Sequence, residues 1–447
     1  MTITNRPSYA TGDIITAEAT PPGRGGISVI RISGAGARKL AAGWFDRDLP
    51  EPGRHRYGRL VRRTGDREEV IDEVVLACYG APHSYTGEEL IEISVHGSPV
   101  VVAEALDALY QSGARPAAPG EFTLRAFING RMDLTQAEGV ADLIAARSRQ
   151  AADQARRQLQ GGLGRAADEA SDLVALLLTG CELELDFVED DVTLTPHGEK
   201  EALVARTLTA LDGMLAGYQT SRRLREGVRV AITGAPNVGK SSLFNALLGE
   251  PRAIVHRLPG TTRDAISAGT VIGGIAFELF DTAGLHETGD EVEDEGIRRA
   301  LQVAETADLK LVVSAPDAPE SAAATTTGEV IKIWNKCDLG GSTPEGSLAV
   351  SALTGEGVDK LKSALCRTAT GGAAPGEGTV SRERHYNCVI RARGAMQRAG
   401  EALRAGQPAE VVAEELREAL AALDELTGKR RLEALLEEIF SSFCIGK

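Results

Sequence analysis

The stretch VRVAITGAPNVGKSSLFNALLG, residues 228–249, constrains the fold of this chain more than any other. An apolar, β-rich run is followed by Gly234-x-x-x-x-Gly239-Lys240-Ser241 and then by a helical pattern. The glycines let backbone N–H groups surround phosphates at the N-terminus of a helix, where anions are favoured. We expect Lys240 to reach the terminal phosphates of a nucleotide and the Ser241 hydroxyl to bind Mg²⁺. The sequence therefore predicts a phosphate-binding loop in an α/β domain.

Two later motifs add a metal-binding carboxylate and a base-recognition pattern. FELFDTAG (277–284) provides Asp281, which can hold Mg²⁺ through water, and Gly284, whose N–H can sense a γ-phosphate. IKIWNKCDL (331–339) contains Asn335-Lys336-x-Asp338 after a further strand pattern. A carboxylate there can accept two hydrogen bonds from the N1 and N2 donors of guanine, which adenine lacks, so the site should reject ATP.

The segment VSALTGEG (350–357) completes the set, because its Ser351, Ala352 and Leu353 are placed to contact the base. These four elements in this order predict a GTPase.

Two residues of these motifs are unusual. Leu285 stands where a Ras-like enzyme has the glutamine that orients the attacking water. The acidic segment 286–296 offers carboxylates that could replace it, and the alternative is an ordinary solvated acidic loop. Asn237, three residues before Lys240, could bind a monovalent cation that supplies the positive charge of an arginine finger. From the residues alone, that role of Asn237 stays open.

The organisation along the chain predicts several domains, because 447 residues correspond to about three. Short β-rich runs and intervening helices predict an α+β domain over 1–128. Helical spacing dominates 129–226, strands alternate with helices over 227–371, and helices return over 372–447. An amphipathic helix must bury its apolar stripe, so we expect the two helical stretches to form one all-α domain with the α/β domain inserted between them.

Composition limits the function classes. The net charge of −15 opposes non-specific binding of nucleic acid, so an RNA partner would need a local basic patch. The six cysteines are scattered without a C-x-x-C pair, which argues against a disulfide framework or a zinc site and fits a reducing cytoplasm. No apolar run is long enough to span a bilayer, and the N-terminal residues lack the pattern of a signal peptide. We therefore expect a cytoplasmic protein without a membrane partner.

At this point the motifs resemble one family closely. PPGRGGISVIRISG, PGEFTLRAFINGRMDLTQAEGVADLI, GAPNVGKSSLFNALL, PGTTRD and the terminal FCIGK together are similar to MnmE, also called TrmE, a family of tRNA-modification GTPases. The likeness runs from near residue 12 to the last residue. It implies an α+β folate-binding and dimerisation domain, a discontinuous all-α domain and an inserted G domain.

The resemblance also implies partners and cofactors. The family is a potassium-activated GTPase whose G domains pair across a homodimer. It forms a heterotetramer with the FAD protein MnmG and adds an aminomethyl or carboxymethylaminomethyl group to C5 of the wobble uridine of certain tRNAs. A 5-formyltetrahydrofolate species binds in the N-terminal domain, and 5,10-methylenetetrahydrofolate is the implied carbon donor.

The resemblance assigns roles to residues of this chain by position. Those for GTP and GDP are Asn237, Val238, Gly239, Lys240, Ser241, Ser242, Thr261, Thr262, Asp281, Thr282, Ala283, Gly284, Asn335, Lys336, Asp338, Ser351, Ala352 and Leu353. The implied potassium ligands are Asn237 and the carbonyls of His256, Leu258 and Thr261. The implied Mg²⁺ ligands are Ser241 and Thr262. The folate contacts are Arg31, Glu88, Arg131 and Lys447, and the catalytic residues are Glu293, which orients the water, and Cys444.

Some positions depart from the family pattern. Pro259 replaces an alanine before GTTRD, His286 replaces an arginine, and the segment 315–330 is short and rich in Ala and Thr. Proline removes an N–H but keeps the carbonyls that would bind potassium, so the cation assignment stands. The role of Cys444 has two alternatives, a thiolate nucleophile or a small apolar contact of a docked tail.

Two other functions compete with tRNA modification. One is a GTPase switch or assembly factor that acts on RNA without modifying it, which would need an RNA-binding module. The other is a folate-binding protein whose G domain only controls dimerisation. The basic clusters of the chain are small, as in SRRLR (221–225) and GKRR (428–431), which favours neither a switch nor an assembly factor.

Overall fold

The computed structural model describes residues 12–64, 67–186, 196–249, 267–281, 306–318, 329–372, 376–430 and 433–446. It divides into two compact units. The terminal unit comprises residues 1–141 and 421–447, and the middle unit comprises residues 142–420. Each is described by itself, and the predicted boundaries after residues 128, 226 and 371 stay predictions. Within the described ranges, no helix has the length and apolar character needed to cross a membrane.

The terminal unit contains a mixed sheet with the strand order β3-β4-β5-β2-β1-β6. Its strands are β1 (Ile15–Glu18), β2 (Ile27–Ser33), β3 (His55–Thr64), β4 (Arg67–Tyr79), β5 (Leu90–His96) and β6 (Arg115–Pro116). Neighbours are antiparallel except β1 and β6, which run parallel. The sequence patterns locate β2, β4 and β5 and miss the polar edge strand β3, whose four arginines hide its alternation.

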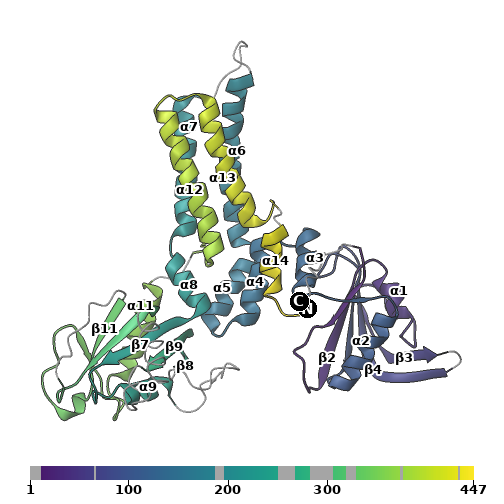
Figure 1. Cartoon of the computed structure of the whole chain (residues 1–447), viewed down its shortest axis with the longest axis horizontal. Coiled ribbons are helices and arrows are strands. Elements are labelled where there is room, and N and C mark those ends of the chain that lie inside the picture. The colour runs from purple at the N-terminus through teal and green to yellow at the C-terminus, as the bar shows by residue number, and fades with distance from the viewer. Residues whose placement is uncertain are drawn as a thin grey trace, which may run out of the picture. The chain divides into compact units, whose positions relative to one another are not determined.

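Helices α1 (Ala37–Ala42) and α2 (Pro99–Gln111) cover one face of this sheet, as Figure 1 shows. The predicted alternation of β5 holds, because Ile91, Ile93 and Val95 are buried against these helices. The opposite face is mixed. Arg31 of β2 lies on it beside Glu92 of β5, to which it is paired in the sheet. A smaller apolar cluster that includes Ile15, Leu90 and Phe122 is separate from the main core. The terminal unit therefore has one apolar face covered by helices and one face that carries both charged and apolar side chains.

A second apolar cluster of the terminal unit joins the two ends of the chain. It is formed by α3 (Glu121–Ile128), the first part of α4 (Leu134–Ala145) and α14 (Glu433–Ser441). Phe440 and Phe443 pack there with their ring centroids 5.3 Å apart. Burial of such aromatic side chains holds the C-terminal helix against the N-terminal part of the same unit.

The middle unit contains a six-stranded sheet with the order β12-β11-β10-β7-β9-β8. Its strands are β7 (Val228–Gly234), β8 (Ser267–Ile272), β9 (Ile275–Asp281), β10 (Leu309–Ser314), β11 (Glu329–Trp334) and β12 (Ser347–Ala349). All pairs are parallel except β8 with β9. Because β7 lies in the centre and its neighbours β10 and β9 come later in the chain, the strand order reverses there, and a ligand is expected at its carboxyl end.

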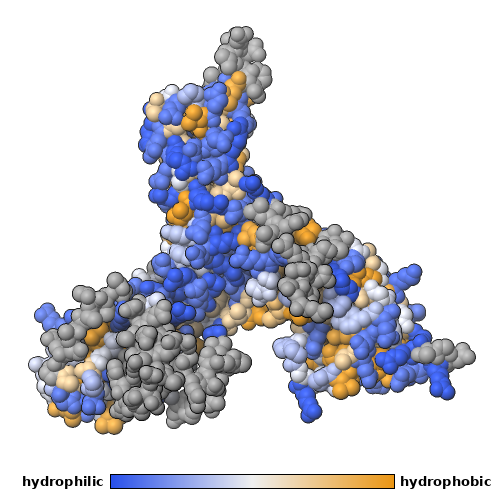
Figure 2. Space-filling model, in the orientation of Figure 1, coloured by the Kyte–Doolittle hydropathy of each residue, from blue (hydrophilic) through white to orange (hydrophobic). Residues whose placement is uncertain are grey.

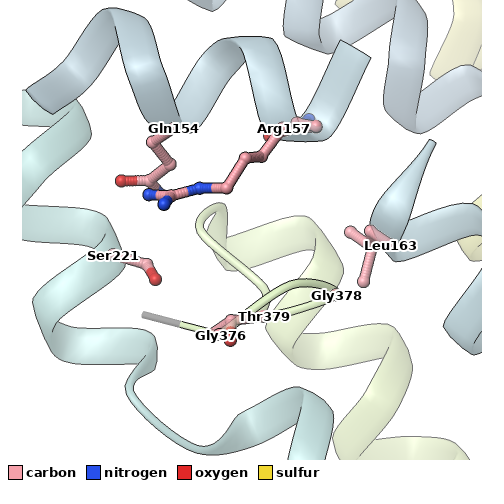
Figure 3. A pocket seen from close by; sticks show the side chains of 8 residues that line it. Gln154, Arg157, Leu163, Ser221, Gly376, Gly378 and Thr379 are labelled. Carbon is pink, nitrogen blue, oxygen red and sulfur yellow. The ribbon is translucent and has the colours of Figure 1, made fainter. Parts of the chain in front are cut away.

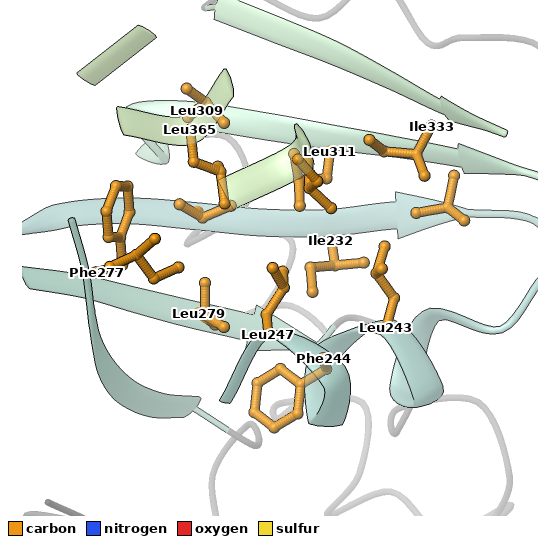
Figure 4. Close-up of a cluster of buried hydrophobic side chains, with 14 of the residues drawn as sticks. Ile232, Leu243, Phe244, Leu247, Phe277, Leu279, Leu309, Leu311, Ile333 and Leu365 are labelled. Carbon is orange, nitrogen blue, oxygen red and sulfur yellow. The ribbon is translucent and has the colours of Figure 1, made fainter. Parts of the chain in front are cut away.

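Apolar side chains on one face of the sheet, including Val228, Val230 and Ile232 of β7, form its main core (Figure 4). Helix α9 (Lys240–Leu248) contributes Leu243, Phe244 and Leu247, and α11 (Val358–Thr370) contributes Leu365. These contacts fix the start of α9 directly after the end of β7, which sets the position of the loop between them.

Four long helices of the middle unit lie side by side (Figure 1): α6 (Gly162–Asp186), α7 (His197–Leu215), α12 (Glu383–Arg404) and α13 (Ala409–Thr427). Ion pairs join them, including Arg393 with Asp212 at 2.5 Å and Arg417 with Glu182 at 2.9 Å. Helices that precede the sheet in the sequence, α6 and α7, thus pack together with helices that follow it, α12 and α13. The surface that Figure 2 shows over these helices is mainly hydrophilic.

Helices α5 (Arg149–Leu159) and α8 (Tyr218–Glu226) lie between the long helices and the sheet of the middle unit. Arg222 of α8 bonds to Asp308, just before β10, at 3.1 Å. Beside the same helix lies a cavity of about 20 Å³, into which Ser221 points (Figure 3). The buried Ser221 hydroxyl and Gln154 Oε1 have no protein partner among the described residues, and the volume suffices for one water.

Candidate functional site

Two glycines fix the shape of the loop between β7 and α9. A Cβ on Gly234, whose φ is 148°, would lie 2.2 Å from the carbonyl oxygen of Val313. A Cβ on Gly239, whose φ is 91°, would lie 2.4 Å from Nδ2 of Asn335. Both distances are shorter than atoms tolerate, so a side chain at either position would displace β10 or the Asn335 loop. The predicted glycines are therefore required by close approach as well as by backbone conformation.

Asn237 lies at the exposed turn of this loop and has a φ of 65°. Asparagine tolerates this left-handed conformation better than most residues. Among the described residues, only one other non-glycine residue, Lys336, has a positive φ. Lys336 lies in the predicted base-recognition motif, so both outliers fall in the candidate site, where strained backbone is often found.

Lys240 is buried and folds back over the loop. Its Nζ donates to the carbonyl oxygens of Gly234 at 2.9 Å and Ala235 at 2.8 Å. Burial lowers the pKa of Lys240, and the nearby carboxylate of Asp281 partly opposes this shift. Ser241, in the first turn of α9, is exposed, so its hydroxyl is accessible beside the lysine.

Asp281 ends β9 and lies directly opposite Ile232 of β7 in the sheet. It is 3% exposed, at the same edge from which the phosphate loop leaves. The hydroxyl of Ser241 and the carboxylate of Asp281 are oxygen donors of the kind that Mg²⁺ prefers. Among the described residues, no group of three or more His, Cys, Asp or Glu forms a metal-binding cluster. A magnesium ion here would accordingly take further ligands from phosphate and water.

Asn335 connects the phosphate loop to the base-recognition loops. Its Nδ2 donates to the carbonyl of Val238 at 2.8 Å, and its Oδ1 accepts from the N–H of Ala352 at 3.2 Å. The side chain is 1% exposed, so Asn335 acts as a brace inside the protein. Ser351 is also fully buried, and its Oγ accepts from the N–H of Thr354 at 3.1 Å.

The residues that remain accessible on the base side are different ones. Asp338 is exposed in a short 3₁₀ helix, η2 (Cys337–Leu339), and Leu353 is 87% exposed. Lys336 Nζ bonds to Asp317 at 2.6 Å, which holds its aliphatic chain along the loop. The carboxylate of Asp338 is therefore accessible, and its contact with guanine stays a prediction.

Several predicted residues lie outside the described part of the chain. They are Thr261, Thr262, His256, Leu258, Thr282, Ala283, Gly284, Glu293 and Lys447, together with Pro259, His286 and residues 319–328 of the short segment. Their predicted roles for potassium, magnesium, water and folate stay predictions.

The mixed face of the terminal unit forms a second candidate site. Arg31 Nε donates to Glu92 at 2.8 Å, and the guanidinium lies 5.4 Å from the ring centroid of Tyr85. Arg31 Nη1 also donates to the carbonyl of Gly446 at 3.4 Å. The predicted folate ligand Arg31 is thus brought next to the C-terminal tail.

Glu88 and Arg131 lie at the same end of this sheet. The Glu88 carboxylate accepts from Ser33 Oγ at 2.8 Å, and Ser33 is two residues from Arg31 on β2. The Arg131 side chain lies beside Gly87, since a Cβ there would come within 3.2 Å of Arg131 Cγ. The structure therefore places Arg31, Glu88 and Arg131 around one polar region.

The tail reaches this region through close backbone contacts. Gly446 has a φ of 91°, and a Cβ on it would lie 2.1 Å from the carbonyl oxygen of Glu18. The carbonyl of Cys444 accepts from the N–H of Gly120 at 3.4 Å, and Cys444 itself is exposed. This close approach explains why residue 446 is a glycine, because any side chain there would clash with the Glu18 carbonyl.

The sequence analysis missed a set of buried ion pairs next to Glu88. Arg125 Nη1 lies 3.1 Å from Glu88, and Arg125 Nη2 lies 3.0 Å from Glu121. Arg115 bonds to Glu121 and to Asp13, both at 2.7 Å. A signal existed, because Glu121 and Arg125 are four residues apart on a helix whose other residues are uncharged.

The comparisons with known proteins agree with these motifs. The model of the MnmE helical domain matches residues 134–444, and that of the GTP-binding protein TrmE N-terminus matches residues 14–131. Curated proteins named tRNA modification GTPase MnmE are similar over 97% of this chain and 99% of their own length. The proteins of Syntrophotalea carbinolica and Nitrosomonas europaea are 41% identical to it, and that of Thermus thermophilus is 42% identical. The chain belongs to the MnmE family of tRNA modification GTPases.

Proposed function

We propose that this chain hydrolyses GTP in a potassium-dependent reaction and, with an FAD-dependent partner of the MnmG type, modifies C5 of the wobble uridine of certain tRNAs. The observation that supports this most is the bond between Asn335 and Val238, which joins a phosphate loop to a guanine-type motif in a member of this family. The added group is aminomethyl or carboxymethylaminomethyl, and the site of action is the cytoplasm.

The nucleotide roles follow from the accessible groups. Lys240 exchanges its bonds to loop carbonyls for bonds to the terminal phosphates, and the cost is small because two acceptors are replaced by charged ones. Ser241, with Asp281 through water, holds Mg²⁺, and Asp338 accepts the two N–H donors of guanine. Thr262 completes the magnesium site by analogy with the family.

The catalytic step needs a positive charge and an oriented water. Asn237 provides an amide oxygen at the exposed turn of the loop, where a potassium ion would lie near the transferred phosphoryl group. The carbonyls of His256, Leu258 and Thr261 complete this cation site, and Glu293 orients the water that Leu285 cannot. A homodimer in which two G domains pair would shield the ion from water.

The mixed face of the terminal unit is the proposed folate site. Arg31, Glu88 and Arg131 lie around it, and Gly446 of the tail bonds to Arg31. By the family assignment, Lys447 and Cys444 would belong to the same site. A bound tetrahydrofolate would supply the one-carbon unit. Glu88 would accept the donors of its pterin ring, and the cations would hold its glutamate tail. The Cys444 thiol is exposed and free, which permits a nucleophilic role.

One variant can separate GTP turnover and tRNA modification from folate binding. Lys240→Ala should lose GTP turnover and tRNA modification in the presence of the FAD partner, and should bind 5-formyltetrahydrofolate as the wild type does. Retained modification without GTP turnover would contradict the proposal. A wild-type protein that hydrolyses GTP and leaves tRNA unmodified with its partner would instead identify a switch or an assembly factor.

A further inference from the structure

Helix α3 carries a buried charge cluster that the nucleotide site and the tail do not use. Arg125 and Glu121 are 3% and 2% exposed in their side chains, and Asp13 and Arg115 lie at the edge of the same cluster. Buried charges are costly unless they are paired, and replacing them with apolar residues is often neutral or stabilising. A cluster of this kind is therefore weak evidence for stability alone, which directs attention to what it holds.

Arg125 is the member of this cluster that reaches Glu88. Its Nη1 lies 3.1 Å from Oε2 and 3.5 Å from Oε1 of Glu88, and the same nitrogen donates to the carbonyl of Asp13 at 2.9 Å. Its Nη2 bonds to Asp13 at 2.5 Å and to Glu121 at 3.0 Å. The bonds to Asp13 and Glu121 thus fix the orientation of the guanidinium, which places Nη1 against the Glu88 carboxylate.

A second group holds Glu88 from the strand. Ser33 Oγ donates to Oε2 at 2.8 Å, and Thr86 Oγ1 lies 2.7 Å from Ser33 Oγ, which fixes the hydroxyl. Glu88 Oε2 is therefore the atom on which both contacts converge. Oε1 makes only the longer 3.5 Å contact with Arg125 and is the oxygen with more acceptor capacity left for a ligand.

We propose that Arg125 is a positioning residue of the folate site: it orients the Glu88 carboxylate so that this carboxylate can accept two adjacent N–H donors of a pterin ring. This inference rests on the proposed folate-binding function. Arg125 is shielded within α3 and acts through Glu88. Because the planar guanidinium is also bonded to Asp13 and Glu121, it presents Nη1 to Glu88 in one orientation, whereas the ammonium of a lysine cannot make this set of bonds at once.

The cluster offers a matched control. Arg115 shares Asp13 and Glu121 with Arg125, but in the described part of the chain its side-chain nitrogens donate to Asp13, Glu121 and the carbonyl of Pro116 rather than to Glu88. Arg115→Lys therefore perturbs the same ion-pair cluster without removing a direct partner of Glu88. A purely structural role of the cluster predicts similar behaviour for the two lysine variants.

The measurement uses two ligands on the full-length chain. One is 5-formyltetrahydrofolate, and the other is an analogue that has a methyl group in place of the 2-amino donor. We expect the wild type to prefer the first by about 10-fold to 100-fold, the range for hydrogen bonds to a charged acceptor. Arg125→Lys should lose most of this preference by weakening only the amino ligand, and Arg115→Lys should keep it.

The outcomes separate the inference from the function on which it rests. Equal preference ratios in wild type and Arg125→Lys, with folate still bound, would overturn the role of Arg125. No binding of 5-formyltetrahydrofolate to the wild type would instead refute the folate site. If thermal unfolding shows that Arg125→Lys is not folded, Arg125→Gln, which keeps a planar pair of N–H donors, is compared with Arg115→Gln, and unchanged ratios in both would overturn the proposal.

Discussion

Nδ2 of Asn335 donates to the carbonyl oxygen of Val238 at 2.8 Å, deep enough that the asparagine is 1% exposed. One end of this side chain is therefore bonded to the phosphate loop, and the other end is bonded to the N–H of Ala352. The base-recognition loops and the phosphate loop are thus linked directly through one side chain. Affinity for the phosphates and selectivity for the base are consequently coupled through a residue that need not touch the nucleotide.

Removing this brace should weaken nucleotide binding. In Asn335→Ala the buried carbonyl of Val238 and the N–H of Ala352 lose their partners, at a cost of about 1–3 kcal/mol each. We expect GDP affinity to fall at least about 10-fold, as measured by titration with a fluorescent GDP. Asn245→Ala, at an exposed position of α9, is the control and should bind normally. Wild-type affinity in Asn335→Ala would show that the loops are held by other contacts.

The exposed carboxylate of Asp338 should determine the choice of base. Asp338→Asn replaces one acceptor with an N–H donor, which no longer matches the N1 and N2 donors of guanine and instead matches the 2-oxo group of xanthine. We expect GTP affinity to fall by about 10²-fold or more and XTP affinity to rise. Competition between the two nucleotides for one site measures this directly. A variant that still prefers GTP would place the base elsewhere.

Gly446 is expected to be intolerant of a side chain because of its contact with Glu18. In Gly446→Ala the new Cβ would lie 2.1 Å from the carbonyl oxygen of Glu18, so the tail should lose its contact with Glu18. Gly113→Ala is a matched control, since Gly113 has a similar φ of 97° with nothing within 4 Å. We expect only Gly446→Ala to weaken 5-formyltetrahydrofolate binding and to speed carboxypeptidase trimming of the tail. Equal trimming of both variants would argue against a docked tail.

The charge cluster of α3 should make the terminal unit sensitive to acid. Burial raises the pKa values of Asp13 and Glu121, but the bonds from Arg115 and Arg125 outweigh burial and hold both below their ordinary 3.8 and 4.5. The unfolded chain then binds more protons than the folded one on acidification, so the free energy of unfolding falls. The contribution is complete above about pH 5.5 and is lost as the pH drops through the lowered folded values.

Tryptophan fluorescence can test this in the intact chain. The protein has two tryptophans, and Trp334→Phe leaves Trp44 as the reporter of the terminal unit. The urea midpoint reported by Trp44 should be constant from pH 7 to about 5.5 and decrease below about pH 4.5. In a Glu121→Gln background the decrease should be shallower. A midpoint that stays constant down to pH 3 would show that these carboxylates contribute no pH-dependent stability.

The sequence predicted those parts of the protein in which a local motif requires a particular type of residue. Gly234 and Gly239 were recognisable because a phosphate loop requires them, and the structure adds the Val313 and Asn335 contacts as a second reason. The helical spacing over 129–226 and 372–447 likewise predicted helices with one buried stripe. In α13 this stripe includes Val412 and Leu416, and in α7 it includes Leu203 and Leu211.

Other features depend on partners distant in the chain and leave little local signal. Strand β3 is rich in arginine because it is an edge strand whose charges pair with β4, so its alternation is weak. Arg125 and Asp13 are 112 residues apart, and the sequence around either residue does not indicate that they form a hydrogen bond. The burial of Asn335 was also invisible, because its motif suggests a ligand contact and the structure shows a brace.

In the proposed mechanism, Asn237 places a potassium ion where other GTPases use an arginine finger. GTP turnover by the purified protein, at matched ionic strength in KCl and in NaCl, tests it most directly. An arginine finger is worth about 10³–10⁵ in rate, so we predict an excess of at least about 10-fold in KCl. Asn237→Gly, which suits the φ of 65° at this position, should abolish the excess and retain GDP binding. Equal rates of the wild type in both salts, or an unchanged excess in Asn237→Gly, would contradict the account.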